Sequence, residues 1–142
     1  MLFNKQFWVI PALIMTLMGC ATVQAETKHD LLTGRTWLAE DINGKGVIDM
    51  LQTTIEFAED GKIGGNAGCN RYFGSARITG QNIEFSPLGA TRKMCPESIM
   101  NQEMAFMQTL ATVKRWDMKN GLLFMYSDSD EAVLRFSEMD KN

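Results

Sequence analysis

Histidine is almost missing from this sequence, with one residue, His29, in 142. It lies near the N-terminus, before the patterned part of the chain. Histidine is the usual base beside a serine or cysteine nucleophile and a common zinc ligand. The sequence therefore excludes Ser-His and Cys-His hydrolase sites, and histidine-containing zinc sites, from the folded domain.

Glycine motifs that bind phosphate are also missing. The stretch "GKIGGNAG", Gly61 to Gly68, fits neither the phosphate loop nor the dinucleotide fingerprint, and its glycines indicate bulges and a sharp bend. The acidic stretch "SDSDE", Ser127 to Glu131, lacks the spacing, glycine and closing glutamate of a calcium loop. We expect no metal site and no cofactor.

Basic residues are too few for a nucleic-acid partner. The chain has 14 Lys and Arg against 17 Asp and Glu, a formal net charge of −3. Loss of residues 1–25 removes one cation, Lys5, and leaves a net charge of −4. Nucleic-acid binding requires a basic surface. The remaining length is enough for one domain, which we expect to be a monomer.

The first residues predict export. Lys5 precedes an apolar run from Phe7 to Met18, and small residues follow it. This is the pattern of a signal peptide, and the run is shorter than the roughly 20 residues of a membrane-spanning helix. We predict a signal region at 1–25, a polar tether at 26–33 and a folded domain at 34–142.

Two cleavage sites compete at the end of this run. The stretch "LMGC", Leu17 to Cys20, resembles the lipobox of bacterial lipoproteins, although Met18 departs from the usual small or branched residue. The stretch "VQA", ending at Ala25, is an ordinary signal-peptidase site. Cleavage before Cys20 predicts a lipid anchor at that thiol and, with Ala21 next, an outer-membrane lipoprotein facing the periplasm. Cleavage after Ala25 predicts a soluble periplasmic protein. The sequence favours lipidation.

Alternating apolar and polar residues dominate the rest of the chain. The clearest period-2 segments are 54–57, 82–85 and 133–136. Hairpin dipeptides lie between such segments: Asn43-Gly44, Asp60-Gly61 and Asn120-Gly121. These dipeptides supply the positive φ of tight turns, so we predict a mostly antiparallel sheet.

One segment has helical spacing instead, from Pro96 to about Val113. Pro96 suits a first helical turn and Glu97 suits the positive end of the helix dipole. The predicted buried stripe consists of Ile99, Met100, Met104, Phe106, Met107, Leu110 and Ala111. We interpret the methionines as core filler rather than as a metal or binding site, because thioethers fill irregular gaps.

Cys69 and Cys95 are the two cysteines of the predicted folded domain. Two thiols without histidine do not complete a structural zinc site. A reactive Cys69 is the alternative; Arg71 and Lys93 would favour its thiolate, but no base accompanies them. In an oxidising compartment two such cysteines pair by default, so we predict a disulfide worth roughly 3 to 4 kcal/mol.

Three segments of the sequence together resemble a known domain family. They are "DINGK" (Asp41 to Lys45), "IEFAEDGKIGGNAGCNRYFG" (Ile55 to Gly74) and "LGATRKMC" (Leu88 to Cys95), with the helix behind them. Together they resemble the META domain of the heat-inducible HslJ-type lipoproteins over nearly all of the mature chain. The resemblance implies a mainly β (α+β) fold, an antiparallel β barrel or half-barrel meander with one packed α-helix. It also implies an envelope protein linked to heat response and antibiotic tolerance, without an established biochemical activity.

Asn70, Arg71 and Arg92 are the candidate binding residues. Asn70 is expected to cap backbone groups beside the bonded cysteine. A Cys69–Cys95 bond would bring Arg71 and Arg92 into one neighbourhood, either as ordinary surface or carboxylate-paired arginines or as an anion-binding patch.

Three function classes stay open from the sequence. The leading one is a noncatalytic stress-response or interaction module of the envelope, with a protein partner there. The second is a small barrel that binds an apolar ligand, although bulky inward residues are expected to fill it: Phe57, Phe85, Phe124 and Phe136. The third is an inhibitor of an exported hydrolase. We expect no enzyme activity.

Overall fold

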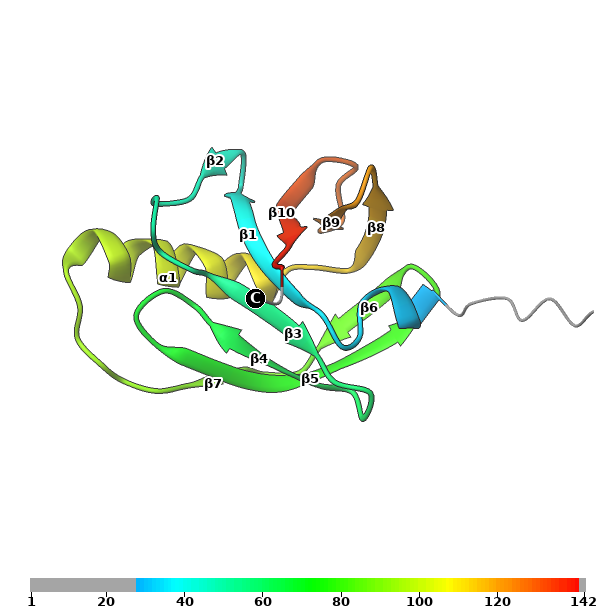
Figure 1. Ribbon diagram of the computed structural model, residues 1–142, viewed down its shortest axis with the longest axis horizontal. Helices are drawn as coiled ribbons and strands as arrows, with labels where there is room; N and C mark the ends of the chain where they lie inside the picture. The colour runs from blue at the N-terminus through cyan, green and yellow to red at the C-terminus, as the bar shows by residue number, and fades with distance from the viewer. Residues whose placement is uncertain (1–27, 141–142) are drawn as a thin grey trace, which may run out of the picture.

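The structure is a computed structural model that describes residues 28–140 (Figure 1). The predicted signal region at 1–25, with Cys20 and both cleavage sites, lies outside the described residues.

Short antiparallel strands make up most of the chain, with one helix among them. The elements in chain order are η1 (Lys28–Leu31), β1 (Thr36–Ile42), β2 (Lys45–Gly46), β3 (Thr54–Phe57), β4 (Lys62–Asn66), β5 (Arg71–Thr79), β6 (Asn82–Phe85), β7 (Gly89–Ala90), α1 (Glu97–Leu110), β8 (Arg115–Lys119), β9 (Leu122–Tyr126) and β10 (Ala132–Glu138). The sheet order is β10-β9-β8-β6-β5-β4-β3-β1-β2, with β7 beside β5. Pairing of β1 with β10 closes the sheet into a ring.

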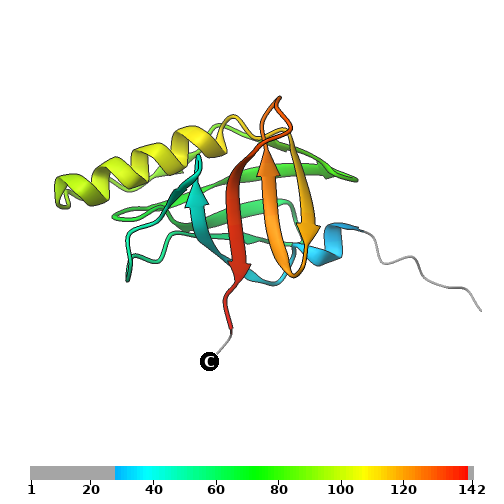
Figure 2. The same ribbon diagram turned by 90° about the horizontal axis from the view of Figure 1, so that it is seen from above.

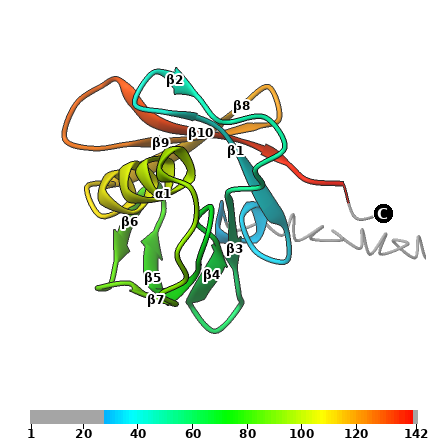
Figure 3. The same cartoon turned by 90° about the vertical axis from the view of Figure 1, so that its left-hand side faces the viewer.

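The ring is not a regular barrel. Strands β1 and β10 pair over most of their lengths, from Trp37↔Glu138 to Ile42↔Leu134. Strands β6 and β8 pair only at Asn82↔Arg115. Helix α1 lies between the two halves of the ring, and Figure 3 shows it end-on with β8 to β10 on one side and β4 to β6 on the other; Figure 2 shows the same layers from above. The expected mainly β fold with one packed helix is confirmed.

Large side chains fill the space between helix and sheet. Trp37, Trp116, Phe106 and Phe136 are at most 1% exposed. Phe106 lies edge-on to Phe136, with ring centres 6.4 Å apart, and in the same way to Tyr72 at 5.6 Å. Burial of these aromatic surfaces stabilises the domain.

Two of the four phenylalanines predicted to fill the interior do so, namely Phe57 and Phe136. Phe85 is half-buried at the edge of the core. The prediction was wrong for Phe124, because the buried face of β9 carries its neighbours Leu123 and Met125. Phe124 therefore lies on the other face, where the Lys119 ammonium approaches its ring at 5.8 Å.

The predicted helical stripe also needs correction. Met104 is 57% exposed and Ala111 follows the helix as an exposed residue, whereas Phe106 and Leu110 are fully buried. Pro96 is the N-cap, so the helix begins one residue later than expected and ends at Leu110. Glu103, the neighbour of Met104, faces the loop before β5, where its carboxylate accepts hydrogen bonds from the backbone N–H groups of Cys69 and Asn70.

The domain begins earlier than the sequence analysis placed it. Leu32 lies in the core with no exposed surface, and its carbonyl accepts a hydrogen bond from the Trp37 indole at 3.2 Å. Thr33 forms a parallel bridge with Phe57. Leu32 and Thr33, which the sequence analysis assigned to the tether, thus belong to the fold.

The predicted hairpin turns all occur. Asn43 and Gly44 have positive φ, as do Asn120 and Gly121, which is the type I′ geometry. At the third dipeptide only Gly61 has positive φ, at 80°. These turns fix the registers of the antiparallel pairs.

Candidate functional site

A disulfide joins Cys69 and Cys95, as the sequence predicts, with Cα atoms 6.0 Å apart. Cys69 precedes β5 by two residues and Cys95 precedes α1 by two. The bond therefore ties the start of a central strand to the start of the helix. Both sulfurs are used in it, so neither cysteine is a nucleophile in this state.

The Asn70 side chain holds the segment that precedes Cys95. Asn70 is 2% exposed, and its Oδ1 accepts hydrogen bonds from the Lys93 backbone N–H at 2.6 Å and the Thr91 hydroxyl at 2.9 Å. Its Nδ2 donates to the Lys93 carbonyl at 3.2 Å. The predicted backbone-capping role is present, but it acts on a segment distant in sequence rather than on local groups.

Glu103 of α1 completes this network. Its Oε2 accepts hydrogen bonds from the backbone N–H groups of Cys69 at 2.8 Å and Asn70 at 2.6 Å. Its Oε1 accepts one from Asn70 Nδ2 at 2.7 Å. Charge-assisted bonds of this kind are about twice as strong as neutral ones. The helix is thus fastened to the start of β5 by three hydrogen bonds beside the disulfide.

Asn70 lies inside the domain rather than on its surface. It is buried, and both of its polar atoms are already hydrogen-bonded within the domain. This corrects the expectation that it would share a ligand patch with Arg71 and Arg92. We call the internal assembly of Cys69, Asn70, Thr91, Cys95 and Glu103 the clamp.

The clamp brings Arg71 and Arg92 to neighbouring backbone positions. The Thr91 N–H donates to the Arg71 carbonyl at 3.0 Å, and the Arg71 N–H donates to the Thr91 hydroxyl at 3.2 Å. Arg92 follows directly, and both arginines are exposed. The expected proximity of their chain positions is therefore present.

Five exposed residues lie along the two segments that the clamp joins, and we treat them as one surface. We call it the clamp surface, and it consists of Arg71, Phe73, Arg92, Lys93 and Met94. Phe73 is 61% exposed and Met94 is 89% exposed. Within residues 28–140 none of its three cations forms an ion pair. Of the alternatives left open by the sequence, carboxylate pairing of the arginines is thus not seen there, and ordinary surface arginines or an anion-binding patch remain.

Sequence reasoning missed Phe73 and Met94, and considered Lys93 only as a cation near Cys69 rather than as a binding residue. Burial alternates along β5, and Phe73 lies on its exposed face. An aromatic residue at a position where the alternation expects a polar one was the sequence feature that could have indicated it. Its ring covers Gly89, where an added Cβ would lie 2.5 Å from Phe73 Cε2. Glycine at 89 therefore leaves room for the ring beside β7.

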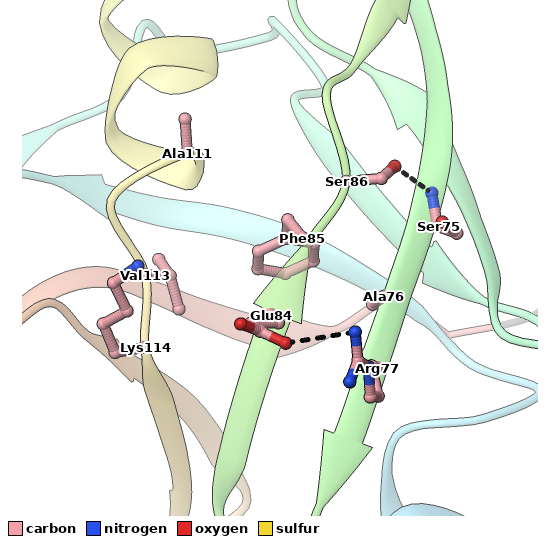
Figure 4. Close-up of a pocket in the computed structure, with 9 residues that line it drawn as sticks. All are labelled: Ser75, Ala76, Arg77, Glu84, Phe85, Ser86, Ala111, Val113 and Lys114. Atoms are coloured by element: carbon pink, nitrogen blue, oxygen red, sulfur yellow. Dashed lines mark hydrogen bonds and ion pairs between the residues drawn. The ribbon is translucent and has the colours of Figure 1, made fainter.

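A groove beside β6 is a second candidate site (Figure 4). Its volume is about 400 Å³. One wall is formed by β5 and β6, with Arg77 and Glu84 3.5 Å apart. The other wall is the connection from α1 to β8, with Ala111, Val113 and Lys114.

Tyr72 is the residue with the most perturbed ionisation in the described chain. Burial raises the pKa of its phenol far above the usual range, and the nearby negative charge of Glu56 raises it further. The hydroxyl donates to the Thr54 carbonyl at 2.8 Å. Tyr72 therefore acts as a buried hydrogen-bond donor rather than as an acid.

The described part of the chain offers no grouping of three or more histidine, cysteine or acidic side chains fit to hold a metal ion. Among residues 28–140 there is also no helix long and apolar enough to cross a membrane.

Comparison with known families gives one match. The META domain matches residues 30–140, which is most of the chain and nearly all of the described residues. The protein belongs to the META domain family. Comparison with curated protein sequences gave no match.

Solved structures share the META fold of this chain. A protein solved by NMR has 22% identity and a TM-score of 0.60, with 75% of this chain and 92% of that chain covered. An NMR structure from Burkholderia xenovorans has 21% identity and a TM-score of 0.61, covering 79% and 86%. A DUF4847 family protein from Bacteroides vulgatus has 12% identity and a TM-score of 0.59, covering 81% and 99%. At these identities the likeness concerns the fold.

Proposed function

We propose that this META domain is a noncatalytic binding module of the cell envelope whose clamp surface binds an acidic protein partner. The observation that carries the proposal is that the clamp fixes the backbone while the cationic side chains on it form no ion pairs. Arg71, Arg92 and Lys93 have no acidic partner within the described residues. The two segments from which they project are crosslinked to each other through Cys69 and Cys95.

The chemistry of the clamp surface supports a protein interface. Arginine, methionine and aromatic residues are enriched in such interfaces. A preorganised backbone lowers the entropy that association costs. The mature chain is net acidic, so three neighbouring cations form a local exception that would steer an acidic partner toward this face.

The envelope location rests on the sequence. The predicted export signal and the lipobox ending at Cys20 support an outer-membrane lipoprotein facing the periplasm, with cleavage after Ala25 as the soluble alternative. Intact-mass measurement of the mature protein distinguishes them: a lipid-modified Cys20 that disappears in Cys20→Ala supports the anchor, and an unmodified chain starting at Glu26 refutes it. The META resemblance supports a role in heat response or antibiotic tolerance.

Site-specific crosslinking tests the binding proposal. A photoreactive residue at Met94 is expected to capture one envelope protein, while the same residue at Ser129, in the exposed turn before β10, is not. Arg71→Glu with Arg92→Glu should abolish the crosslink. The matched control, Lys45→Glu with Arg135→Glu, changes two exposed cations elsewhere and should leave it intact. A crosslink that survives the first pair, or is lost in both, contradicts the proposal.

The identity of the captured partner distinguishes the remaining function classes. An exported hydrolase whose activity falls on addition of the domain would identify an inhibitor. The apolar-ligand alternative is less well supported, because Trp37, Phe106 and Phe136 fill the interior. Purified protein is expected to show background activity on ester, peptide and glycan substrates, and a turnover lost in Cys69→Ala with the fold intact would contradict a noncatalytic role.

A further inference from the structure

Strand β6 has one fully paired edge and one largely open edge. On one side it pairs with β5 along its whole length, from Ala76↔Phe85 to Thr79↔Asn82. On the other side its only strand partner is β8, at Asn82↔Arg115. Beyond that pair the chain before β8 turns away toward α1, and the groove occupies the place of a further strand.

The backbone groups of Phe85 point into this open side. In an antiparallel strand the N–H and C=O of one residue point to the same edge, and those of its neighbours point to the other. The Ser86 N–H donates to the Ser75 carbonyl of β5 at 2.9 Å, so Ser86 faces the paired edge. The Ile83 N–H donates to the Lys114 carbonyl at 2.9 Å, on the open side. Phe85 therefore presents one donor and one acceptor to the groove.

The groove continues past both ends of this position. Toward the β5–β6 turn, a hollow of about 370 Å³ is lined by Thr79, Asn82 and Lys114. In the other direction, a hollow of about 450 Å³ is lined by Phe85, Leu88 and Met107. Each of these hollows shares lining residues with the central groove, so the three hollows lie next to one another along the open edge.

We propose that the open edge of β6 binds an extended peptide that carries an acidic side chain. A free strand edge accepts a peptide backbone as an added strand, and the pockets beside it accept alternate side chains. Here Phe85 supplies the backbone pair, and the exposed Ala111 on the opposite wall supplies apolar contact.

The charges of the groove favour an acidic residue in the peptide. Glu84 is paired with Arg77, both of them mostly exposed. Lys114 lines the groove, is exposed and has no ion pair within residues 28–140. One cation is therefore left without a partner at the wall opposite β6. This site is separate from the clamp surface, so the two proposals fail independently.

Titration of the ¹⁵N-labelled mature chain with a blocked Thr-Val-Glu-Val-Thr peptide tests the site. The largest amide shifts are expected at Ile83 to Ser86 and at Lys114, with slowed exchange of the Phe85 amide. The same peptide N-methylated at alternate residues keeps its side chains but loses its donors, so it should not bind. Equal binding of both peptides, or absence of shifts at Phe85 up to about 5 mM peptide, would overturn the proposal.

Charge exchange supplies the matched controls. Lys114→Glu should weaken binding of the glutamate peptide about three- to fivefold and strengthen binding of a peptide with lysine in its place. Lys45→Glu, an exposed lysine of β2, should change neither affinity, and unchanged spectra away from the groove would show that each variant is folded. The same affinity in Lys114→Glu as in the unmodified protein would reject the acidic specificity.

Discussion

The clamp and the β6–β8 seam hold the same sheet in opposite ways. At the clamp, a disulfide and three hydrogen bonds to Glu103 fasten β5 to α1. At the seam, two strands meet at Asn82↔Arg115 and are joined by backbone hydrogen bonds from Ile83 and Trp116. The ring is thus covalently reinforced at one place and barely closed at another.

Because of this difference, the clamp and the seam are suited to two different kinds of binding. A fastened segment presents side chains in one arrangement, which favours recognition by a preformed surface. A strand edge with free backbone groups accepts a chain that completes it. Proteins open locally where few contacts hold them, so the seam is expected to open before the clamp.

The largest effect is expected from the disulfide. Replacing Cys69 and Cys95 together by alanine should lower the free energy of unfolding by about 3 to 4 kcal/mol, because the unfolded chain regains the entropy of the closed loop. Denaturant unfolding measures the change. In the unmodified denatured protein, thiol labelling before reduction should find neither cysteine free, and labelling at both would contradict the bond.

Glu103→Ala is expected to cost about 2 to 3 kcal/mol, because the backbone N–H groups of Cys69 and Asn70 lose a charged acceptor. Glu97→Ala removes a carboxylate from the exposed first turn of the same helix and should cost under about 1 kcal/mol. Equal costs in denaturant unfolding would show that the clamp network contributes little.

Tyr72→Phe is expected to cost about 1 kcal/mol at neutral pH, because the buried Thr54 carbonyl loses its donor. The raised pKa of Tyr72 favours the neutral phenol in the folded state. An unfolded tyrosine ionises near pH 10, so the unmodified protein loses this contribution above about that pH, and the phenylalanine variant has none to lose. The stability gap should narrow from pH 9 to pH 11; a constant gap would contradict the raised pKa.

The smallest effect is expected at the seam. Gln81→Ala removes an exposed hydrogen bond to Asp117 at 3.1 Å and should cost under about 0.5 kcal/mol. Hydrogen exchange sharpens the comparison with the clamp: the Ile83 and Trp116 amides should exchange faster than those of Cys69 and Asn70. Slower amide exchange at the seam than at the clamp would contradict the expectation that the seam opens first.

Local patterns of the sequence predicted much of the fold. Alternation identified the buried faces at 54–57 and 133–136, and Asn43-Gly44 with Asn120-Gly121 identified type I′ turns, because these signals depend on neighbouring residues alone. The helix was found, but its buried face was not, because Met104 satisfies the helical period as well as Phe106 does. Which of these two residues is buried depends on the elements against which the helix packs.

In the candidate site, too, features that depend on contacts between distant residues were not predicted from the sequence. The Cys69–Cys95 pair followed from cysteine count and compartment, and neither depends on three-dimensional contacts. The burial of Asn70 did not follow, because its partners, Lys93 and Glu103, are distant in sequence.

The sequence by itself determined the strands and turns, the paired cysteines and membership of the META family, since each is encoded in adjacent residues or in their spacing; the export signal that it predicts lies outside the described residues. Only the tertiary structure decided that Asn70 is internal, that Phe73 and Met94 are exposed beside Arg71, and that the ring is nearly open at β6. Burial and strand closure are properties of contacts between distant segments, and the packing of α1 between the two halves of the ring settles them.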